Sequence, residues 1–373
     1  MAESKNSKRL RALGVVVGLT LQIVGFASTA WARLDIIAGS RFTSAQIAAL
    51  GDSALTFGDE MSTGLFYNPA NLAKIRKFNL QILNYSIGGT SAWVNHLNSN
   101  SFNVINLNSY ASTMDAYPGQ KFGGSWSVFP SISFPFLTFG ILAQSEFGGK
   151  SDGSGNITYQ TVSQLIPALG TGFRFFNGVV RFGYSLQYVN QAVGTQTASS
   201  SSSLNYTSGL SQGSGLSHTF GLSIVIPQPT IPTLSVVVRN AFNTVYSSYS
   251  LFQFSQSPSG TPPTEMMTVD LAYSMSMRVA PGVNSHWSIA YRDLQNRSDV
   301  ASWIAHVGSG VELAIKESFL LRAGYRTGHP SFGMGIKKPG AEISLAYYTE
   351  EVGSHYLEQA DSKFIFQLRT SIY

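Results

Sequence analysis

The sequence predicts an all-β protein, a transmembrane antiparallel β-barrel, and three observations lead to that class. Charged residues make up only 12% of the 373 residues, about half the share that is usual in a soluble globular domain. After an N-terminal segment, no apolar stretch reaches the roughly 18 residues that a membrane-spanning helix needs. Hydrophobic residues instead alternate with small or polar ones, which is how a barrel distributes the residues that face lipid.

The first 32 residues have the pattern of a signal peptide. Four basic residues precede an apolar run, Leu13–Ala27, and Ala30 and Ala32 then have the spacing that signal peptidase accepts. We expect cleavage after Ala32 and export to the outer membrane of a bacterium. The alternative is a retained anchor helix, for which the apolar run is short.

Charge and cysteine content exclude several classes of function. The net charge of +5 includes four basic residues against one acidic residue in the signal segment, so the mature chain carries only about +2. No basic patch remains to bind nucleic acid, and we expect no nucleic-acid partner. With no cysteine, the chain has neither disulfide bonds nor thiolate metal sites.

Residues 76–373 are predicted to form the barrel. In TVDLAYSMSMRVA, residues 268–280, apolar side chains from Val269 to Val279 alternate with Asp270 to Arg278. The opposite face carries Gly, Ser, Thr, Gln and Arg rather than the Lys and Glu of a soluble sandwich, which is the alternative fold. The pattern recurs in residues 179–189, 217–226, 286–292, 302–313, 319–326 and 342–347. We count about 14 strands from Phe78 onward, with 12 or 16 as alternatives because the number should be even.

Loops and the C-terminus fit the same class. Ser-rich residues 194–215 and 247–265 are predicted to be long outer loops, whereas residues 337–342 (KKPGAE) predict a short turn. The chain ends on FIFQLRTSIY, an alternating strand with a terminal aromatic residue, as bacterial outer-membrane barrels usually have. Tyr373 itself falls one residue out of phase with Phe364 and Phe366.

A sharp corner precedes the first strand, in LFYNPANLAKI, residues 65–75. Pro69 lacks a backbone N–H and suits the first position of a helix, and Asn68 can cap that helix from outside. The residues therefore predict a corner followed by a helical turn, Ala70–Ile75. Taken alone, these residues favour the interpretation as an ordinary capped turn.

The whole stretch before the barrel resembles the N-terminal region of the FadL/PorV group of outer-membrane barrels, which includes FadL/TodX-like transport proteins and PorV-like proteins. The matching residues are Ala49, Gly51, Ala54, Asp59, Glu60, Tyr67, Asn68, Pro69, Ala70, Leu72 and Ala73, while Asn71 replaces the usual Gly. The resemblance implies that residues 33–75 form a hatch, or plug, inside a 14-stranded barrel. It also implies a hatch motif made of Asp59, Glu60, Tyr67, Asn68, Pro69 and Ala70.

Two functions are implied by the resemblance. One is passive uptake of hydrophobic or amphipathic small molecules, fatty-acid-like ones among them, with a largely apolar pocket between hatch and wall. The alternative is a PorV-like scaffold or shuttle that binds a secreted protein through its outer loops. Outer-membrane lipid is a partner in both cases. The six histidines lack metal-ligand spacing, and nothing in the sequence places a Ser, a His and an Asp together, so we predict no metal, no cofactor and no enzymatic activity.

Charged residues on the polar face are mostly arginines. The candidate luminal charges are Arg181, Arg239, Asp270, Arg278, Arg292, Glu312, Arg322, Arg326, Glu342 and Arg369. One hypothesis is that they make an interior that attracts acidic head groups. The other, which we favour because buried charges are normally paired, is that they bind barrel carboxylates and the hatch residues Asp52, Asp59 and Glu60.

Overall fold

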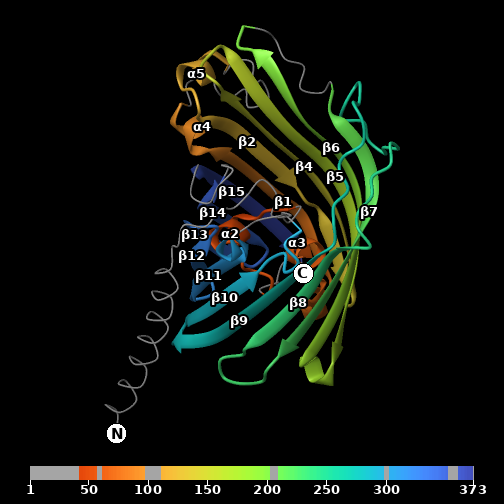
Figure 1. Ribbon diagram of the computed structural model, residues 1–373. Helices are drawn as coiled ribbons and strands as arrows, with labels where there is room; N and C mark the ends of the chain where they lie inside the picture. The colour runs from red at the N-terminus through yellow and green to blue at the C-terminus, as the bar shows by residue number, and fades with distance from the viewer. Residues whose placement is uncertain are drawn as a thin grey trace.

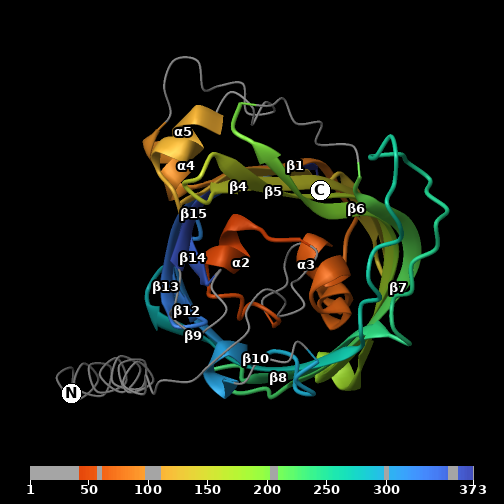
Figure 2. The same ribbon diagram turned by 45° about the horizontal axis from the view of Figure 1, so that its top comes forward.

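The computed structural model describes residues 42–56, 61–96, 111–201, 209–297, 302–351 and 360–372. In these ranges the chain forms an antiparallel β-barrel around short helical segments (Figures 1 and 2). Each strand pairs with its neighbour in sequence, and β1 (Asn79–Thr90) pairs with β15 (Ala360–Ile372) to close the ring. The predicted fold class is therefore confirmed. The signal segment lies outside the described residues.

The wall contains 14 strands, as the sequence predicts. Fifteen strand segments are present, but β2 and β3 both lie between β1 and β4 and are two halves of one strand. Besides β1 and β15, the segments are β2 (Lys121–Val128), β3 (Ser131–Phe134), β4 (Leu137–Ser151), β5 (Asn156–Phe175), β6 (Val180–Ser199), β7 (Ser211–Val225), β8 (Thr233–Ala241), β9 (Thr268–Ala280), β10 (Val283–Tyr291), β11 (Val307–Ile315), β12 (Phe319–Arg326), β13 (His329–Lys338) and β14 (Ala341–Glu351).

The break between β2 and β3 occurs at Phe129 and Pro130. Proline cannot donate to the ladder, so it interrupts the strand at this point. Phe129 is fully buried there and packs on Phe42 and Phe66, with ring centroids 6.0 and 5.4 Å away. The interruption thus lets Phe129, a residue of the wall, pack into the apolar cluster that lies inside the barrel.

Alternation along the strands separates an apolar outer surface from a polar inner one. On β13, Phe332, Met334 and Ile336 are exposed on the outer surface, whereas Ser331 faces inward and is buried. The same exposure of large apolar side chains recurs on strands all around the ring. An apolar exterior over a wall of paired strands is what a bilayer requires, because lipid offers no partners for backbone groups.

The two ends of the barrel differ. At one end, the short-turn end, strands are joined by tight turns such as Pro339–Gly340 between β13 and β14, which confirms the predicted turn. At the other, the long-loop end, residues 242–267 join β8 to β9. The β6–β7 connection is shorter than predicted, because β6 extends to Ser199 and β7 begins at Ser211. Strands β4–β7 are long and rise above the rest of the wall (Figure 1).

Some short helices lie outside the lumen. Helices α4 (Ser91–Asn95) and α5 (Ala111–Ala116) cover the outer face of the wall near the long-loop end (Figure 2). They form a small core in which Trp93 and Met114 join wall side chains. Two of the described 3₁₀ segments are η3 (Phe176–Gly178), in a turn, and η4 (Trp303–His306). Residues 303–306 were expected to continue a strand, so that prediction was wrong: β11 begins only at Val307.

The remaining helices fill the lumen (Figure 2). These are α2 (Ala45–Ala49), α3 (Met61–Phe66) and η1 (Pro69–Lys74), and we call the described residues of this part of the chain, 42–56 and 61–75, the hatch. Ser44 caps α2 by accepting a hydrogen bond from the Ile47 backbone N–H. Within the described residues, no helix is long and apolar enough to cross a membrane. The hatch helices are instead held by apolar side chains that pack together and against the wall.

Candidate functional site

The Asn-Pro-Ala corner has the local structure that its residues predict. Pro69 begins η1, and the Asn68 Oδ1 accepts a hydrogen bond from the Ala70 N–H at 3.0 Å. The helical turn is a 3₁₀ helix, one residue shorter than predicted at its C-terminal end. The side-chain amides of Asn68 and Asn71 both donate to the Leu55 carbonyl, at 2.8 and 3.0 Å. Asn71, which replaces the usual Gly, therefore ties the corner to the preceding hatch segment.

Glycines of the wall provide the seat for this corner. A Cβ atom at Gly183 on β6 would lie 2.1 Å from the Pro69 carbonyl carbon, and one at Gly221 on β7 only 2.2 Å from the Asn68 Oδ1. On β5, a Cβ at Gly172 would lie 2.3 Å from the Ala73 nitrogen. Only a wall without side chains at these positions lets the hatch backbone approach so closely.

A second glycine seat lies on the other side of the lumen. There Leu50 and Gly51 rest on Gly308, Gly310 and Gly324 of β11 and β12, where a Cβ atom would meet the hatch backbone at 2.3 to 2.5 Å. Our sequence reasoning did not identify either seat. The available signal was the repeated glycine on the polar face of the strands.

A buried charge cluster joins the hatch to the wall. Asp52 of the hatch binds Arg292 at 2.6 Å and Arg326 at 3.5 Å. Arg292 also binds Asp270 at 3.1 Å, and Asp270 in turn binds Arg239 at 2.7 Å. Except for Arg326, these side chains are almost entirely buried. Charges so deeply buried are stable only as a paired set.

Tyr67 of the hatch motif lies beneath this cluster. Its ring faces the guanidinium carbons of Arg239 and Arg292, 5.5 and 5.8 Å from the ring centroid. Its hydroxyl donates to the Phe42 carbonyl at 2.5 Å. The predicted motif residue therefore contacts two of the predicted luminal arginines.

Protonation of Asp52 is expected to loosen the hatch in acid. Burial would raise the pKa of this carboxyl, but the charges of Arg292, Arg326 and Arg239 outweigh burial and hold the pKa below its usual value of 3.8. A carboxyl with a lowered pKa stabilises the folded state fully above its unfolded value, and this stabilisation is lost as the pH falls through the folded value. We therefore expect hatch protection to be constant from neutral pH to about pH 5 and to fall below about pH 4.

Hydrogen exchange of residues 45–56, corrected for the intrinsic rate at each pH, measures this protection. Exchange in the Asp52→Asn variant should lack the additional acceleration below pH 4. Equal acid dependence in the two proteins would show that another group controls the hatch.

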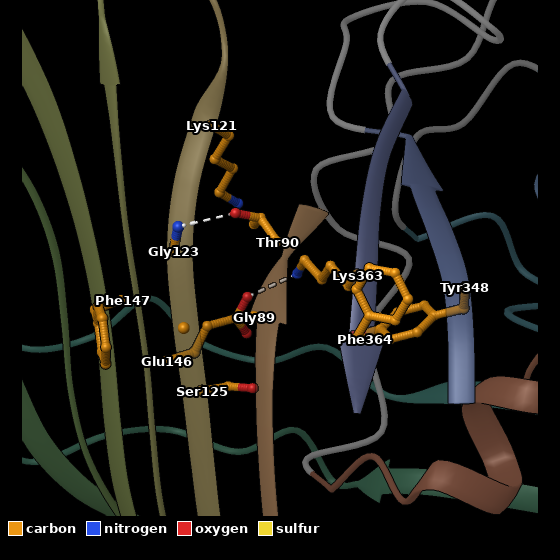
Figure 3. Close-up of a pocket in the computed structure, with 11 residues that line it drawn as sticks. Gly89, Thr90, Lys121, Gly123, Ser125, Glu146, Phe147, Tyr348, Lys363 and Phe364 are labelled. Atoms are coloured by element: carbon orange, nitrogen blue, oxygen red, sulfur yellow. Dashed lines mark hydrogen bonds and ion pairs between the residues drawn. The ribbon is translucent and has the colours of Figure 1, made fainter. Parts of the chain in front are cut away.

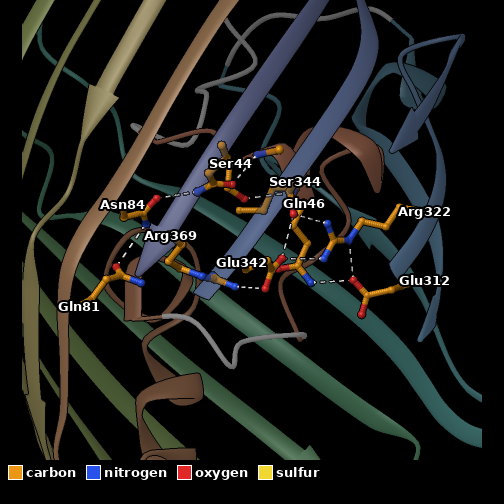
Figure 4. Close-up of polar contacts among 12 residues, drawn as sticks. Ser44, Gln46, Gln81, Asn84, Glu312, Arg322, Glu342, Ser344 and Arg369 are labelled. Carbon is orange, nitrogen blue, oxygen red and sulfur yellow. Dashed lines mark hydrogen bonds and ion pairs between the residues drawn. The ribbon is translucent and has the colours of Figure 1, made fainter. Parts of the chain in front are cut away.

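A second charge network lies on β11, β12, β14 and β15 (Figure 4). Arg322 binds Glu312 at 2.6 Å and Glu342 at 3.3 Å, and Glu342 also pairs with Arg369. The hatch joins this network through Gln46, whose side-chain amide donates to Glu312 at 3.0 Å. The network thus fixes α2 against the wall.

The other predicted charges lie elsewhere. Arg181 is half-buried near the β5–β6 turn, and Arg278 is exposed near the short-turn end, where its Nε donates to the Ala280 carbonyl. Asp59 and Glu60 lie outside the described residues. The structure thus brings together two groups of the candidate luminal charges and leaves Arg181 and Arg278 apart from both. Its ion pairs favour the hatch-holding hypothesis over the anion-attracting one.

An open cavity of about 130 Å³ lies between the hatch and the wall on the long-loop side. Polar groups dominate its lining, including Ser86, Ser127, Gln144, Tyr348 and Glu350. This differs from the largely apolar pocket that we expected. The hatch leaves part of the lumen open. This open part is lined mainly by the polar face of the alternating strands rather than by apolar side chains of the hatch.

Amide and hydroxyl side chains continue this polar lining along the inner wall. The Gln144 amide donates to Gln164 at 2.5 Å, and the Gln164 amide donates to Gln191 at 2.7 Å. The Ser86 and Ser127 hydroxyls lie 2.6 Å apart. No group of three or more potential metal ligands occurs in the part of the chain that the structure describes. The open part of the lumen is therefore lined by hydrogen-bonding side chains.

Comparison with known proteins identifies the fold. No protein-family model matches the sequence, and no curated protein sequence does. Solved structures do match. The Pseudomonas putida toluene transporter TodX aligns over 89% of this chain and 99% of its own, with a TM-score of 0.53 and 13% identity. A TodX deltaS2S3 mutant, described as a monoaromatic hydrocarbon channel, aligns over 88% and 98%, with a TM-score of 0.51 and 12% identity.

A Pseudomonas aeruginosa FadL homologue also aligns, over 88% of this chain and 98% of its own, with a TM-score of 0.46 and 11% identity. The alignment with TodX shows that the chain has the same barrel fold, which is the fold that the resemblance of its N-terminal region implies.

Proposed function

We propose that the protein is an outer-membrane channel for passive uptake of hydrophobic or amphipathic small molecules, with its short-turn end in the periplasm. One observation carries the proposal: a closed barrel encloses a hatch that leaves an open cavity at its side. The fold of the toluene transporter TodX supports it. A path beside a hatch needs no energy source, because the solute moves down its own gradient.

Fatty-acid-like molecules are one substrate class within this proposal and aromatic hydrocarbons are another. The polar cavity favours amphipathic molecules, since their polar ends would find hydrogen-bonding partners there. The hatch and the apolar side chains around it would contact the remainder.

Uptake measurements in cells test the proposal. A host that lacks its own FadL-type transporter is given this chain or an empty vector, and initial uptake of radiolabelled toluene and of radiolabelled oleate is followed. We expect at least one compound to enter several-fold faster with the chain. Equal rates for both compounds, with the barrel present in the outer membrane, would contradict the proposal.

Native mass spectrometry separates this function from that of a PorV-like scaffold. Protein extracted gently from its own membranes is examined for bound small molecules and bound proteins. A stoichiometric amphipathic molecule supports the channel. A stoichiometric secreted protein would instead indicate a scaffold whose outer loops bind it.

A further inference from the structure

Near the long-loop end of the barrel, the inner wall beside the cavity carries carboxylates that are more exposed than the ammonium group they bind. Glu146 of β4 and Glu350 of β14 line the cavity. Lys363 of β15 binds Glu146 at 2.8 Å (Figure 3) and Glu350 at 2.7 Å. The ammonium group lies behind the carboxylates: the Lys363 side chain is 10% exposed, against 53% for Glu146 and 35% for Glu350. A solute in the cavity therefore meets the carboxylates first.

A third carboxylate strengthens this asymmetry. Asp361 lies directly opposite Glu350 in the β14–β15 ladder and is almost entirely buried. Its Oδ2 is buried without a hydrogen-bond partner among the described residues. A buried carboxylate oxygen without a partner is rare in folded proteins and needs a donor. Lys121 also lies at this end, so three carboxylates face two ammonium groups and the local charge is −1.

The cavity itself has no basic residue in its described lining. Serine hydroxyls, an amide and a phenol accompany the two carboxylates. The luminal arginines that could bind an anion are engaged elsewhere: Arg292 and Arg322, for example, are buried in ion pairs at the hatch. The cavity lining thus offers hydrogen bonds and negative charge to a solute. The nearby ammonium groups of Lys121 and Lys363 line a smaller adjoining pocket instead (Figure 3), where Lys363 is bound to Glu146 and Glu350.

We propose that this cavity is a head-group subsite, which admits neutral hydrogen-bonding and cationic head groups and disfavours carboxylates and other anions. The inference rests on the proposed uptake function and sharpens it, because it separates amphipathic alcohols and amines from free fatty acids. Desolvation accentuates the selection, since an anion that leaves bulk water here finds no cation in the cavity lining to compensate it.

Release of three phenyl compounds from liposomes tests this subsite. Purified full-length protein is reconstituted, and efflux of benzyltrimethylammonium, phenyl glucoside and benzenesulfonate is measured, with the membrane potential held at zero by valinomycin and equal potassium. The three probes share an aromatic ring, their charges are independent of pH, and they cross protein-free bilayers slowly. We expect the cation and the neutral glycoside to leave faster than the anion.

Charge variants link any selectivity to this cavity. In Glu350→Gln, Lys363 keeps its partner Glu146, so the wall should still fold. We expect the cation-to-anion efflux ratio to fall by about fivefold, the effect of one nearby charge in a hydrated site. Glu146→Gln should act in the same direction. Glu317→Gln, an equal charge change in the exposed β11–β12 turn, is the matched control and should leave the ratio unchanged.

Each outcome decides the inference. Equal efflux of all three probes, or faster efflux of the anion, would overturn it and leave the uptake function intact. If none of the probes leaves the liposomes while cells expressing the chain take up toluene or oleate, a polar subsite on the route is excluded. Failure of cellular uptake as well would remove the proposed function. An equal change of the ratio in Glu317→Gln would show that overall charge, not the cavity, sets the selectivity.

Discussion

Replacement of Asp52 by asparagine will weaken the attachment of the hatch by about 3–5 kcal/mol at neutral pH, the range for breaking a buried ion pair. The variant removes one of two carboxylates that balance Arg239 and Arg292, both of which are buried. Asp270 alone would then face two guanidinium groups. Because the asparagine side chain is nearly identical in shape, packing is preserved and the effect is electrostatic.

Thiol labelling can measure this loss, since the chain has no cysteine of its own. A single Ala54→Cys substitution places a reporter in the hatch, where residue 54 is fully buried. We expect Asp52→Asn to raise its labelling rate roughly 100- to 4,000-fold, the factor that corresponds to the lost free energy. Asp152→Asn, an exposed carboxylate in the β4–β5 turn, serves as the control. A rate within twofold of the parent in Asp52→Asn would show that the ion pairs do not hold the hatch.

Addition of one methyl group at Gly183 will displace the hatch corner. In Gly183→Ala the new Cβ atom would lie 2.1 Å from the Pro69 carbonyl group, so backbone must move. We expect the packing of the corner against the wall to be destabilised by about 3 kcal/mol or more, at the upper end of the range for overpacking. The cost is high because backbone atoms cannot rotate away from the new methyl group. The outer membrane should then become more permeable to vancomycin, and planar bilayers should show larger conductance.

Gly260→Ala is the matched control for this variant. A Cβ atom at residue 260 would meet only the Ser211 hydroxyl, at 4.0 Å. Gel mobility before and after heating establishes that both barrels fold. Wild-type permeability in Gly183→Ala, with a folded barrel, would mean that the corner does not depend on its glycine seat.

The wall could be predicted from the sequence because its signal is local. The alternation in TVDLAYSMSMRVA corresponds residue for residue to β9, Thr268–Ala280. The same local rule failed at Trp303–His306, where apolar residues two apart belong to a 3₁₀ segment. Alternation of apolar and polar residues does not by itself distinguish a strand from a short 3₁₀ segment. In such a segment, tertiary packing determines the backbone conformation.

The site could be predicted only in part, because its contacts join distant residues. Alternation put Arg292 and Arg322 on the polar face of their strands, and both form buried ion pairs in the structure. The corner motif predicted a helix start that Asn68 caps, as the structure has it. The pairing of Asp52 with Arg292, 240 residues apart, depends on the barrel topology. Gly183 and Gly221 looked like ordinary small residues in the sequence, since a glycine shows its role only when the backbone opposite is known.

The pairing of the first strand with the last has a consequence for biogenesis. The ring can be sealed only after residues 360–372 have been synthesised, because β15 supplies the partner of β1. The hatch, by contrast, leaves the ribosome before any strand. It also rests on β5–β7 at one side and on β11–β12 at the other. An early segment that touches both halves of an unfinished sheet can act as an internal template around which the sheet curls. In this view, the hatch contributes to assembly before it contributes to permeability.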